Sequence, residues 1–154
     1  MSDSLTSSLP DLVKQLADKL IAKKLIIATA ESCTGGGISQ ALTALAGSSD
    51  WFDSGFVTYS NAAKQRLLNV PADLFEVDGP GAVSEAVVLA MTNGAIANSR
   101  ANLAVAVSGV AGSRSVVTTW TSPANSANFM TARARSPSPS LPATCRCRAP
   151  LTVG

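Results

Sequence analysis

The chain of 154 residues contains no histidine. This absence excludes Ser-His-Asp and Cys-His catalysis within one chain, and it excludes every metal site that needs an imidazole ligand. The three cysteines are an odd number and include no C-x-x-C pair, so neither a disulfide framework nor a zinc site is expected. We therefore expect no metal and no cofactor, and a hydrolase built on this sequence needs Lys, Tyr, Asp or Glu as its base.

Long apolar runs are also missing. No apolar stretch reaches the ~18–20 residues that a membrane span requires, and the polar, acidic N-terminal stretch does not resemble a secretory signal. We expect a cytoplasmic protein without a membrane partner. All ten acidic residues and only seven of the twelve basic residues precede position 113, so no nucleic-acid surface is predicted in that part.

Apolar periodicity and end signals predict seven elements before residue 113. Three helices begin after a candidate capping serine, namely Ser8, Ser60 and Ser84. The predicted order is helix 8–25, strand 25–30, helix 37–47, strand 53–61, helix 60–70, helix 84–100 and strand 101–112. This alternation indicates an α/β fold, in which ligands bind at the carboxyl ends of the strands.

The composition changes after Gly112. Residues 113–154 hold five of the eight prolines, five arginines, much Ser and Thr, and no Lys, Asp or Glu. This composition predicts a low-complexity tail without a packed core, and hence a domain over 1–112 followed by a disordered segment over 113–154. Two interpretations stay open: a natural tail, or GC-rich coding DNA read out of frame, which yields Arg, Pro, Ser, Ala and stray Cys.

The stretch "TAESCTGGG" (29–37) follows the first predicted strand and opens a helix. It could hold a nucleophile, cradle a phosphate or merely turn the chain. Ser32 and Cys33 are both nucleophile candidates; the phosphate interpretation is weak, because the stretch lacks the Gly-Lys-Ser/Thr ending of a P-loop. By itself, a glycine-rich turn of this kind is more often plain architecture than a catalytic centre.

Four stretches together, "TAESCTGGG" (29–37), "AGSSDWFDSGFVTYSNAAK" (46–64), "GAVSE" (81–85) and "VAVSGVAG" (105–112), resemble the C-terminal domain of the competence/damage-inducible CinA proteins. That domain also occurs alone as nicotinamide-nucleotide amidase, and the chain resembles this stand-alone form. The resemblance implies a three-layer α/β/α sandwich, usually oligomeric. It also implies hydrolysis of nicotinamide mononucleotide to nicotinate mononucleotide and ammonia, in pyridine-nucleotide recycling, without a metal.

The resemblance also assigns roles. Ser32 matches the family's nucleophile, and Tyr59 and Lys64 match its companions. Lys64 would act as a neutral amine, Tyr59 would relay a proton toward the leaving ammonia, and backbone N–H groups of the turn 33–36 would stabilise the oxyanion. The expected substrate-binding residues are Glu31, Cys33, Thr34, Gly35, Gly36, Asn61, Ser108 and Gly109.

Several of these residues have a plainer alternative. Glu31 could orient Lys64 or satisfy free N–H groups at the start of the next helix, and Lys64 by default is a solvated charge. Asn61 could bind a carboxamide or close a turn. Arg66 and Arg100 could meet a phosphate, although single surface arginines usually meet water.

The family's later motifs, a Pro-Gly-Gly-rich loop, a "KPVGTVW" strand, a "GDR" turn and a final helix, are not found after Gly112. Their loss predicts an unpaired sheet edge and weak or no activity. The alternative function is a catalytically impaired domain that acts as a nucleotide- or protein-binding module.

Overall fold

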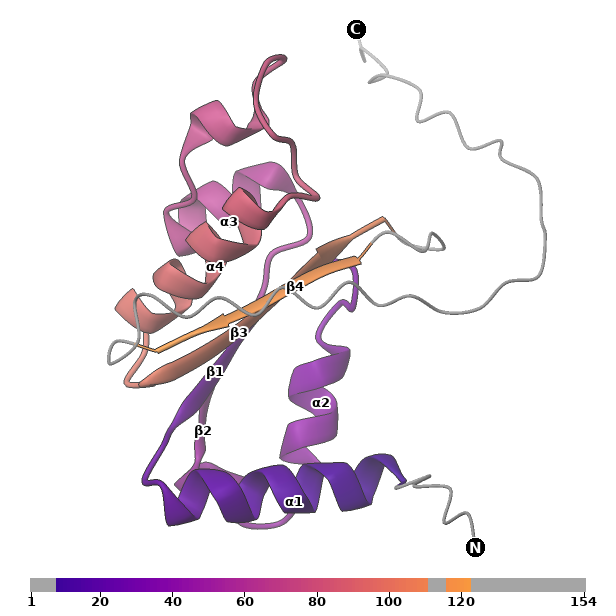
Figure 1. Cartoon of the computed structure of the whole chain (residues 1–154), viewed down its shortest axis with the longest axis vertical. Helices are drawn as coiled ribbons and strands as arrows, with labels where there is room; N and C mark the ends of the chain where they lie inside the picture. The colour runs from indigo at the N-terminus through magenta and orange to yellow at the C-terminus, as the bar shows by residue number, and fades with distance from the viewer. Residues whose placement is uncertain (1–7, 111–115, 123–154) are drawn as a thin grey trace, which may run out of the picture.

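The computed structural model describes residues 8–110 and 116–122 (Figure 1). Its elements in chain order are α1 (Leu9–Ala22), β1 (Ile27–Glu31), α2 (Gly37–Thr43), the 3-10 helix η1 (Ser48–Asp50), β2 (Phe52–Val57), α3 (Asn61–Leu68), the 3-10 helix η2 (Ala72–Phe75), α4 (Glu85–Ala97), β3 (Leu103–Gly109) and β4 (Val116–Thr121).

Serine side chains cap three of the helices, as the sequence predicts. The Ser8 hydroxyl accepts a hydrogen bond from the Asp11 backbone N–H, and the Asp11 carboxylate accepts one from the Ser8 backbone, which completes a capping box. Ser60 caps α3 and Ser84 caps α4 in the same way, each accepting from the backbone N–H three residues later. These short-range contacts fix where each helix begins, because they satisfy N–H groups that have no partner inside the helix.

The strands form one mixed sheet in the order β2-β1-β3-β4. β1 is parallel to both β2 and β3, and Glu31 at its end lies in register with Val57 of β2 and Val107 of β3. The carboxyl ends of three strands therefore meet at one edge of the sheet, where α/β folds place their ligands.

Helices cover both faces of the sheet (Figure 1). On one face, α3 and α4 pack through Leu68, Val88 and Met91. These side chains lie against small strand residues that include Ala30 and Ala106. On the other face, α1 and α2 pack against the strand side chains that point to that side of the sheet, and against the buried Trp51. This three-layer α/β/α arrangement confirms the predicted fold class.

The structure differs from the sequence-based expectation after Gly112. β4 pairs antiparallel with β3, from Ala104↔Thr121 to Gly109↔Val116, so this edge of β3 is not unpaired. The strand forms because Val116, Val117, Trp120 and the intervening threonines suit a pleated, half-buried surface. The rest of the predicted tail, residues 113–115 and 123–154, lies outside the described residues, and the predicted lack of a packed structure there stays a prediction.

The helix α1 also exposes apolar side chains outside the face that it buries. The helix buries Val13, Ala17 and Leu20, whereas Leu12 is 52% exposed. Leu12 contributes instead to an apolar groove of about 480 Å³ between α1 and α2.

Among residues 8–110 and 116–122, no helix is both long and apolar enough to cross a membrane.

Candidate active site

The site forms where the chain leaves β1 and β2. The backbone N–H of Ser32 donates to the Val107 carbonyl at 3.0 Å, and that of Thr58 donates to the Glu31 carbonyl at 2.7 Å. Each ladder thus continues one residue beyond its strand. The side chains of Ser32 and Thr58 are both buried, so this edge of the sheet presents a protected nucleophile candidate rather than an open turn.

Lys64 brings its amine to this nucleophile candidate. The Nζ atom lies 2.9 Å from the Ser32 Oγ, and it donates to the backbone carbonyls of Thr58 at 2.8 Å and Tyr59 at 3.3 Å. Side chains on an α-helix lean toward its N-terminus, so a lysine in the first turn of α3 extends back over the end of β2. Only 1% of Lys64 is exposed, so the solvated interpretation is wrong.

Burial changes the acidity of this amine. Desolvation lowers the pKa of Lys64 below its ordinary value of 10.5, although the neighbouring Cys33 side chain acts in the opposite direction. A buried ammonium loses hydration that three acceptors replace only in part, so the Lys64 ammonium gives up its proton more readily than that of an exposed lysine. The result is a group that can accept a proton from a hydroxyl at hydrogen-bond distance.

Glu31 faces away from this amine and toward α2. Its fully buried carboxylate accepts hydrogen bonds from the backbone N–H groups of Ile38 at 2.9 Å and Ser39 at 2.7 Å. The hydroxyls of Thr34, Ser39 and Thr29 complete the set at 2.7, 2.6 and 3.3 Å. Burial raises the pKa of Glu31, but these hydrogen bonds outweigh it and hold the pKa below its ordinary value. Of the two expected roles, the geometry matches the helix-capping one, and the carboxylate does not orient Lys64.

The turn between Ser32 and Gly37 has a left-handed backbone at Gly35 (φ +59°) and Gly36 (φ +98°). The N–H groups of Gly35 and Gly37 are used inside the turn, donating to the carbonyls of Ser32 and Thr34. Within the described residues, the N–H groups of Cys33, Thr34 and Gly36 make no hydrogen bond to the protein, so three donors of the expected oxyanion turn are available for a ligand.

Tyr59 and Asn61 lie on the exposed rim between β2 and α3. Tyr59 is 65% exposed, and its ordered contribution to the site is the backbone carbonyl that accepts from Lys64. Asn61 is the exposed first residue of α3. The structure therefore brings the Tyr59 backbone to the Lys64 amine, and within the described residues neither the Tyr59 nor the Asn61 side chain forms a hydrogen bond to that amine.

Ser108 lies at the end of β3, on the same edge of the sheet as Ser32. It is 1% exposed, and its hydroxyl donates to the Ala82 carbonyl at 2.7 Å. Gly109, which follows, is half-buried and ends the strand. Ser108 therefore ties the loop before α4 to the rim of the site.

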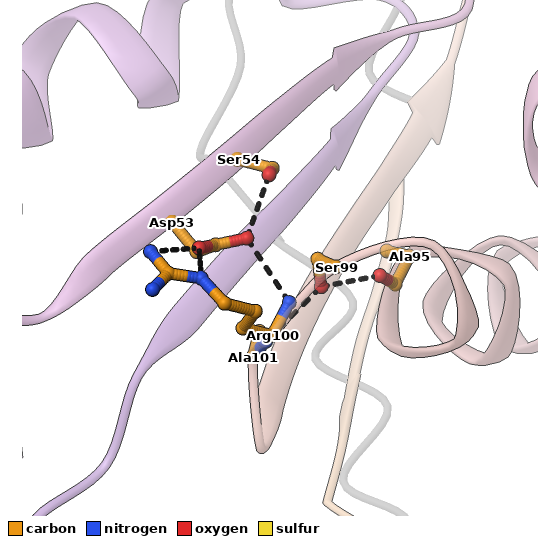
Figure 2. A network of polar contacts seen from close by, with 6 residues as sticks. All are labelled: Asp53, Ser54, Ala95, Ser99, Arg100 and Ala101. Carbon is orange, nitrogen blue, oxygen red and sulfur yellow. Dashed lines mark hydrogen bonds and ion pairs between the residues drawn. The ribbon is translucent and has the colours of Figure 1, made fainter.

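The two arginines considered for a phosphate are placed differently. Arg100 lies at the opposite end of the sheet, where its guanidinium forms an ion pair with Asp53 at 2.9 Å and its backbone N–H donates to the same carboxylate (Figure 2). It therefore ties the start of β2 to the loop before β3, away from Ser32. Arg66 is exposed in the last turn of α3.

Two residues that hold this site were missed by sequence reasoning. Thr58 supplies the nearest carbonyl to the Lys64 amine, and Ser39 supplies two of the five hydrogen bonds to Glu31. Thr58 carried a weak signal, because it lies beside Tyr59 at the end of a strand. Ser39 carried none, since its partner is eight residues away across a turn.

The family model of the CinA C-terminal domain matches residues 10–124. The chain belongs to this family. The match extends through β4, and it includes every residue of the site described above.

Similar curated proteins carry two kinds of name. The chain is 55% identical over 101 residues to nicotinamide-nucleotide amidohydrolase PncC of Pseudomonas putida, covering 66% of this chain and 62% of the relative. It is 46% identical over 106 residues to PncC of Escherichia coli K12, covering 69% and 63%. A CinA-like protein of Colwellia psychrerythraea is 50% identical over 116 residues, covering 73% of this chain and 26% of the relative. The chain thus spans less than two thirds of each of these relatives.

Solved structures show the same fold. The competence/damage-inducible protein CihA of Agrobacterium tumefaciens superposes with a TM-score of 0.73 at 37% identity, covering 84% of each chain. The competence damage-inducible protein A (ComA) of Klebsiella pneumoniae superposes with a TM-score of 0.75 at 35% identity, covering 83% of this chain and 82% of that one.

Proposed function

We propose that this chain hydrolyses the carboxamide of nicotinamide mononucleotide, releasing ammonia and nicotinate mononucleotide. The observation that carries the proposal is the buried pair in which the Lys64 Nζ lies 2.9 Å from the Ser32 Oγ. The substrate is inferred from the names of two relatives, at 46% and 55% identity, which are called nicotinamide-nucleotide amidohydrolase. Acyl transfer to water is the reaction class for which a serine with an adjacent base is suited.

The contacts of Lys64 explain how an amine can act as the base. The carbonyls of Thr58 and Tyr59 can only accept hydrogen bonds, so each accepts one from an N–H group of the neutral amine. The lone pair of the nitrogen is then left for the Ser32 hydroxyl. This orientation resembles the role of a histidine in a triad, with two carbonyls in place of the carboxylate that orients it.

The first half of the reaction forms an ester. Lys64 removes the proton of the Ser32 hydroxyl, and the Ser32 Oγ attacks the carboxamide carbon, whose oxygen becomes an oxyanion. The N–H groups of Cys33 and Gly36 are the proposed donors to this oxyanion; removing one such donor elsewhere costs about 3 kcal/mol in the transition state. When the tetrahedral intermediate collapses, the C–N bond breaks and the nitrogen takes a proton from the Lys64 ammonium, directly or through the exposed Tyr59 hydroxyl, and leaves as ammonia.

The second half releases the acid. A water molecule gives a proton to the Lys64 amine and attacks the ester carbon. Collapse of this second intermediate breaks the bond to the Ser32 Oγ, which recovers its proton from Lys64. The products are nicotinate mononucleotide and free enzyme, so no atom or charge is left on the protein. Every proton therefore passes through one amine that alternates between its two forms.

Ammonia release from nicotinamide mononucleotide tests the proposal. Wild-type turnover is expected to be weak, because the family's later motifs are not found after Gly112. Ser32→Ala and Lys64→Ala should each lower kcat further, by about 10³-fold or more, because the nucleophile and its base act as a unit. The matched control is Lys14→Ala, since Lys14 lies on the exposed side of α1, away from the site. Turnover that survives both site substitutions would reject the assignment; nucleotide binding without wild-type turnover would favour the binding-module alternative.

A further inference from the structure

The carboxylate of Glu31 is completely buried, yet no basic side chain pairs with it among the described residues. Its five hydrogen bonds come from three hydroxyls and two backbone N–H groups. A buried charge without a counter-ion is costly unless such donors surround it. An arrangement this expensive, directly beside the proposed nucleophile, needs an explanation that packing does not supply.

The donors lie along one short segment of chain. Thr34 lies in the middle of the turn that follows Ser32, and Ile38 and Ser39 lie in the first turn of α2. Glu31 itself precedes Ser32 directly. The carboxylate therefore links the start, middle and end of the turn that carries the proposed nucleophile and its three available N–H groups.

The neighbouring strands support this arrangement. The Thr29 hydroxyl of β1 lies 2.6 Å from the Ser39 hydroxyl, which in turn donates to Glu31. Thr29 has one hydroxyl proton, which Ser39 and the more distant Glu31 carboxylate at 3.3 Å therefore share. Gly55 of β2 leaves the space for it, because a Cβ at this position would overlap the Ser39 Oγ. A hydrogen-bonded layer of Thr29, Ser39 and Glu31 thus lies between the sheet and the turn.

We propose that Glu31 is the positioning residue of this site: its carboxylate holds the turn 32–37 so that the Ser32 hydroxyl stays within reach of the Lys64 amine. The inference rests on the proposed function and deepens it. The buried Glu31 carboxylate makes no hydrogen bond to Lys64, and it acts through Thr34, Ile38 and Ser39 rather than through the direct substrate contact that the resemblance implied. A misplacement of about 1 Å at a reacting group costs on the order of 10²-fold in rate, so a clamp on this turn affects catalysis directly.

The test variant is Glu31→Gln. A glutamine has the same shape, but in either orientation its NH₂ group faces a backbone N–H, of Ile38 or of Ser39, and neither can accept. The matched control is Asp53→Asn, the same carboxylate-to-amide change in a hydrogen-bonded group at the opposite end of the sheet. Ser39→Ala is the milder second variant, because it removes one hydroxyl and keeps the charge and the backbone donors.

The measurements are kcat and KM for nicotinamide mononucleotide at a temperature well below each variant's unfolding midpoint, and the rate at which a fluorophosphonate labels Ser32. We expect Glu31→Gln to lower kcat and the labelling rate about 10-fold or more, with KM within about twofold of wild type. Ser39→Ala is expected to lower both rates by a smaller factor. Asp53→Asn is expected to match wild type.

A folded Glu31→Gln with wild-type kcat and labelling rate would overturn the proposal, because a merely structural residue changes only the unfolding midpoint. A raised KM at unchanged kcat would overturn it in favour of substrate binding. If Glu31→Gln does not fold, wild-type rates in Ser39→Ala overturn it. Labelling of Ser32 without turnover of the nucleotide rejects only the proposed substrate, and the labelling rates still decide the role of Glu31.

Discussion

Lys64 and Ser32 are 32 positions apart, and the structure brings the lysine Nζ to 2.9 Å from the serine Oγ in a buried environment. Neither residue acquires this relationship from its neighbours in the sequence. Ser32 is held at the edge of the sheet, because its backbone N–H extends the β1–β3 hydrogen bonding by one residue. Lys64 reaches Ser32 because α3 begins shortly after β2 ends.

The first prediction concerns pH. Because burial lowers the pKa of Lys64 below 10.5, kcat/KM should rise with pH as the amine loses its proton, with a midpoint below 10.5. Lys64→Arg should be inactive at every pH, since a guanidinium keeps its proton. A pH–rate profile of both proteins measures this. A wild-type midpoint at or above the ordinary lysine value would contradict the assigned base.

The same shift has a consequence for stability. Between the folded-state pKa of Lys64 and the unfolded value near 10.5, the unfolded chain binds a proton that the folded chain has released. The free energy of unfolding should therefore rise with pH in this window. Denaturant unfolding of wild type at several pH values, with Lys64→Met as the reference that lacks this proton, gives the slope; equal slopes in the two proteins would contradict it.

A second prediction separates the two nucleophile candidates. Cys33→Ala should keep kcat within about threefold of wild type, because the Lys64 amine bonds to the Ser32 hydroxyl and not to the thiol. Mass spectrometry after brief exposure to substrate should find the acyl group on the peptide of Ser32. Loss of turnover in Cys33→Ala, with the protein still folded, would transfer the role to the thiol.

A third prediction concerns acid stability. The hydrogen bonds that lower the pKa of Glu31 below 4.5 contribute stability that is present above that pH and lost as pH falls through the folded-state pKa. Glu31→Gln should therefore lower the free energy of unfolding by about 3 kcal/mol at neutral pH, and by less in acid. Chemical denaturation at neutral and acidic pH measures both differences. A difference independent of pH would mean that the charge is not involved.

A fourth prediction compares two adjacent glycines. Gly36→Ala should destabilise the protein by about 1–2 kcal/mol and lower kcat, because φ is +98° there and a Cβ would lie 3.2 Å from the Val57 Cγ2. Gly37→Ala should be neutral or slightly stabilising, since Gly37 lies in α2 with no atom within 4 Å of its Cβ position. Thermal unfolding and kcat of the pair provide the comparison; equal effects would remove the special role of Gly36.

A fifth prediction concerns the ion pair at the far end of the sheet. Arg100→Ala should change stability by no more than about 1 kcal/mol, because the arginine side chain is 85% exposed and Asp53 keeps its contacts with Ser54 and the backbone. KM for the nucleotide should not change. A several-fold rise in KM would instead indicate that Arg100 binds the substrate phosphate.

The local parts of the fold were predictable from the sequence. The helices capped by Ser8, Ser60 and Ser84 begin where predicted, since a cap depends on residues only three positions apart. β4 was not predicted: its short run of Val, Thr and Trp lies in a segment whose overall composition indicates no packed core. Only pairing with β3 makes it a strand.

The sequence by itself excluded histidine as the base and left Lys, Tyr, Asp and Glu as candidates, and the motifs around Ser32 and Lys64 indicated the family. Only the tertiary structure decided that Lys64 is buried against Ser32 and that Glu31 bonds to α2. The physical reason is that burial and hydrogen-bond partners depend on segments far apart in the chain, and these two properties set the acidity of a group and the direction in which it acts.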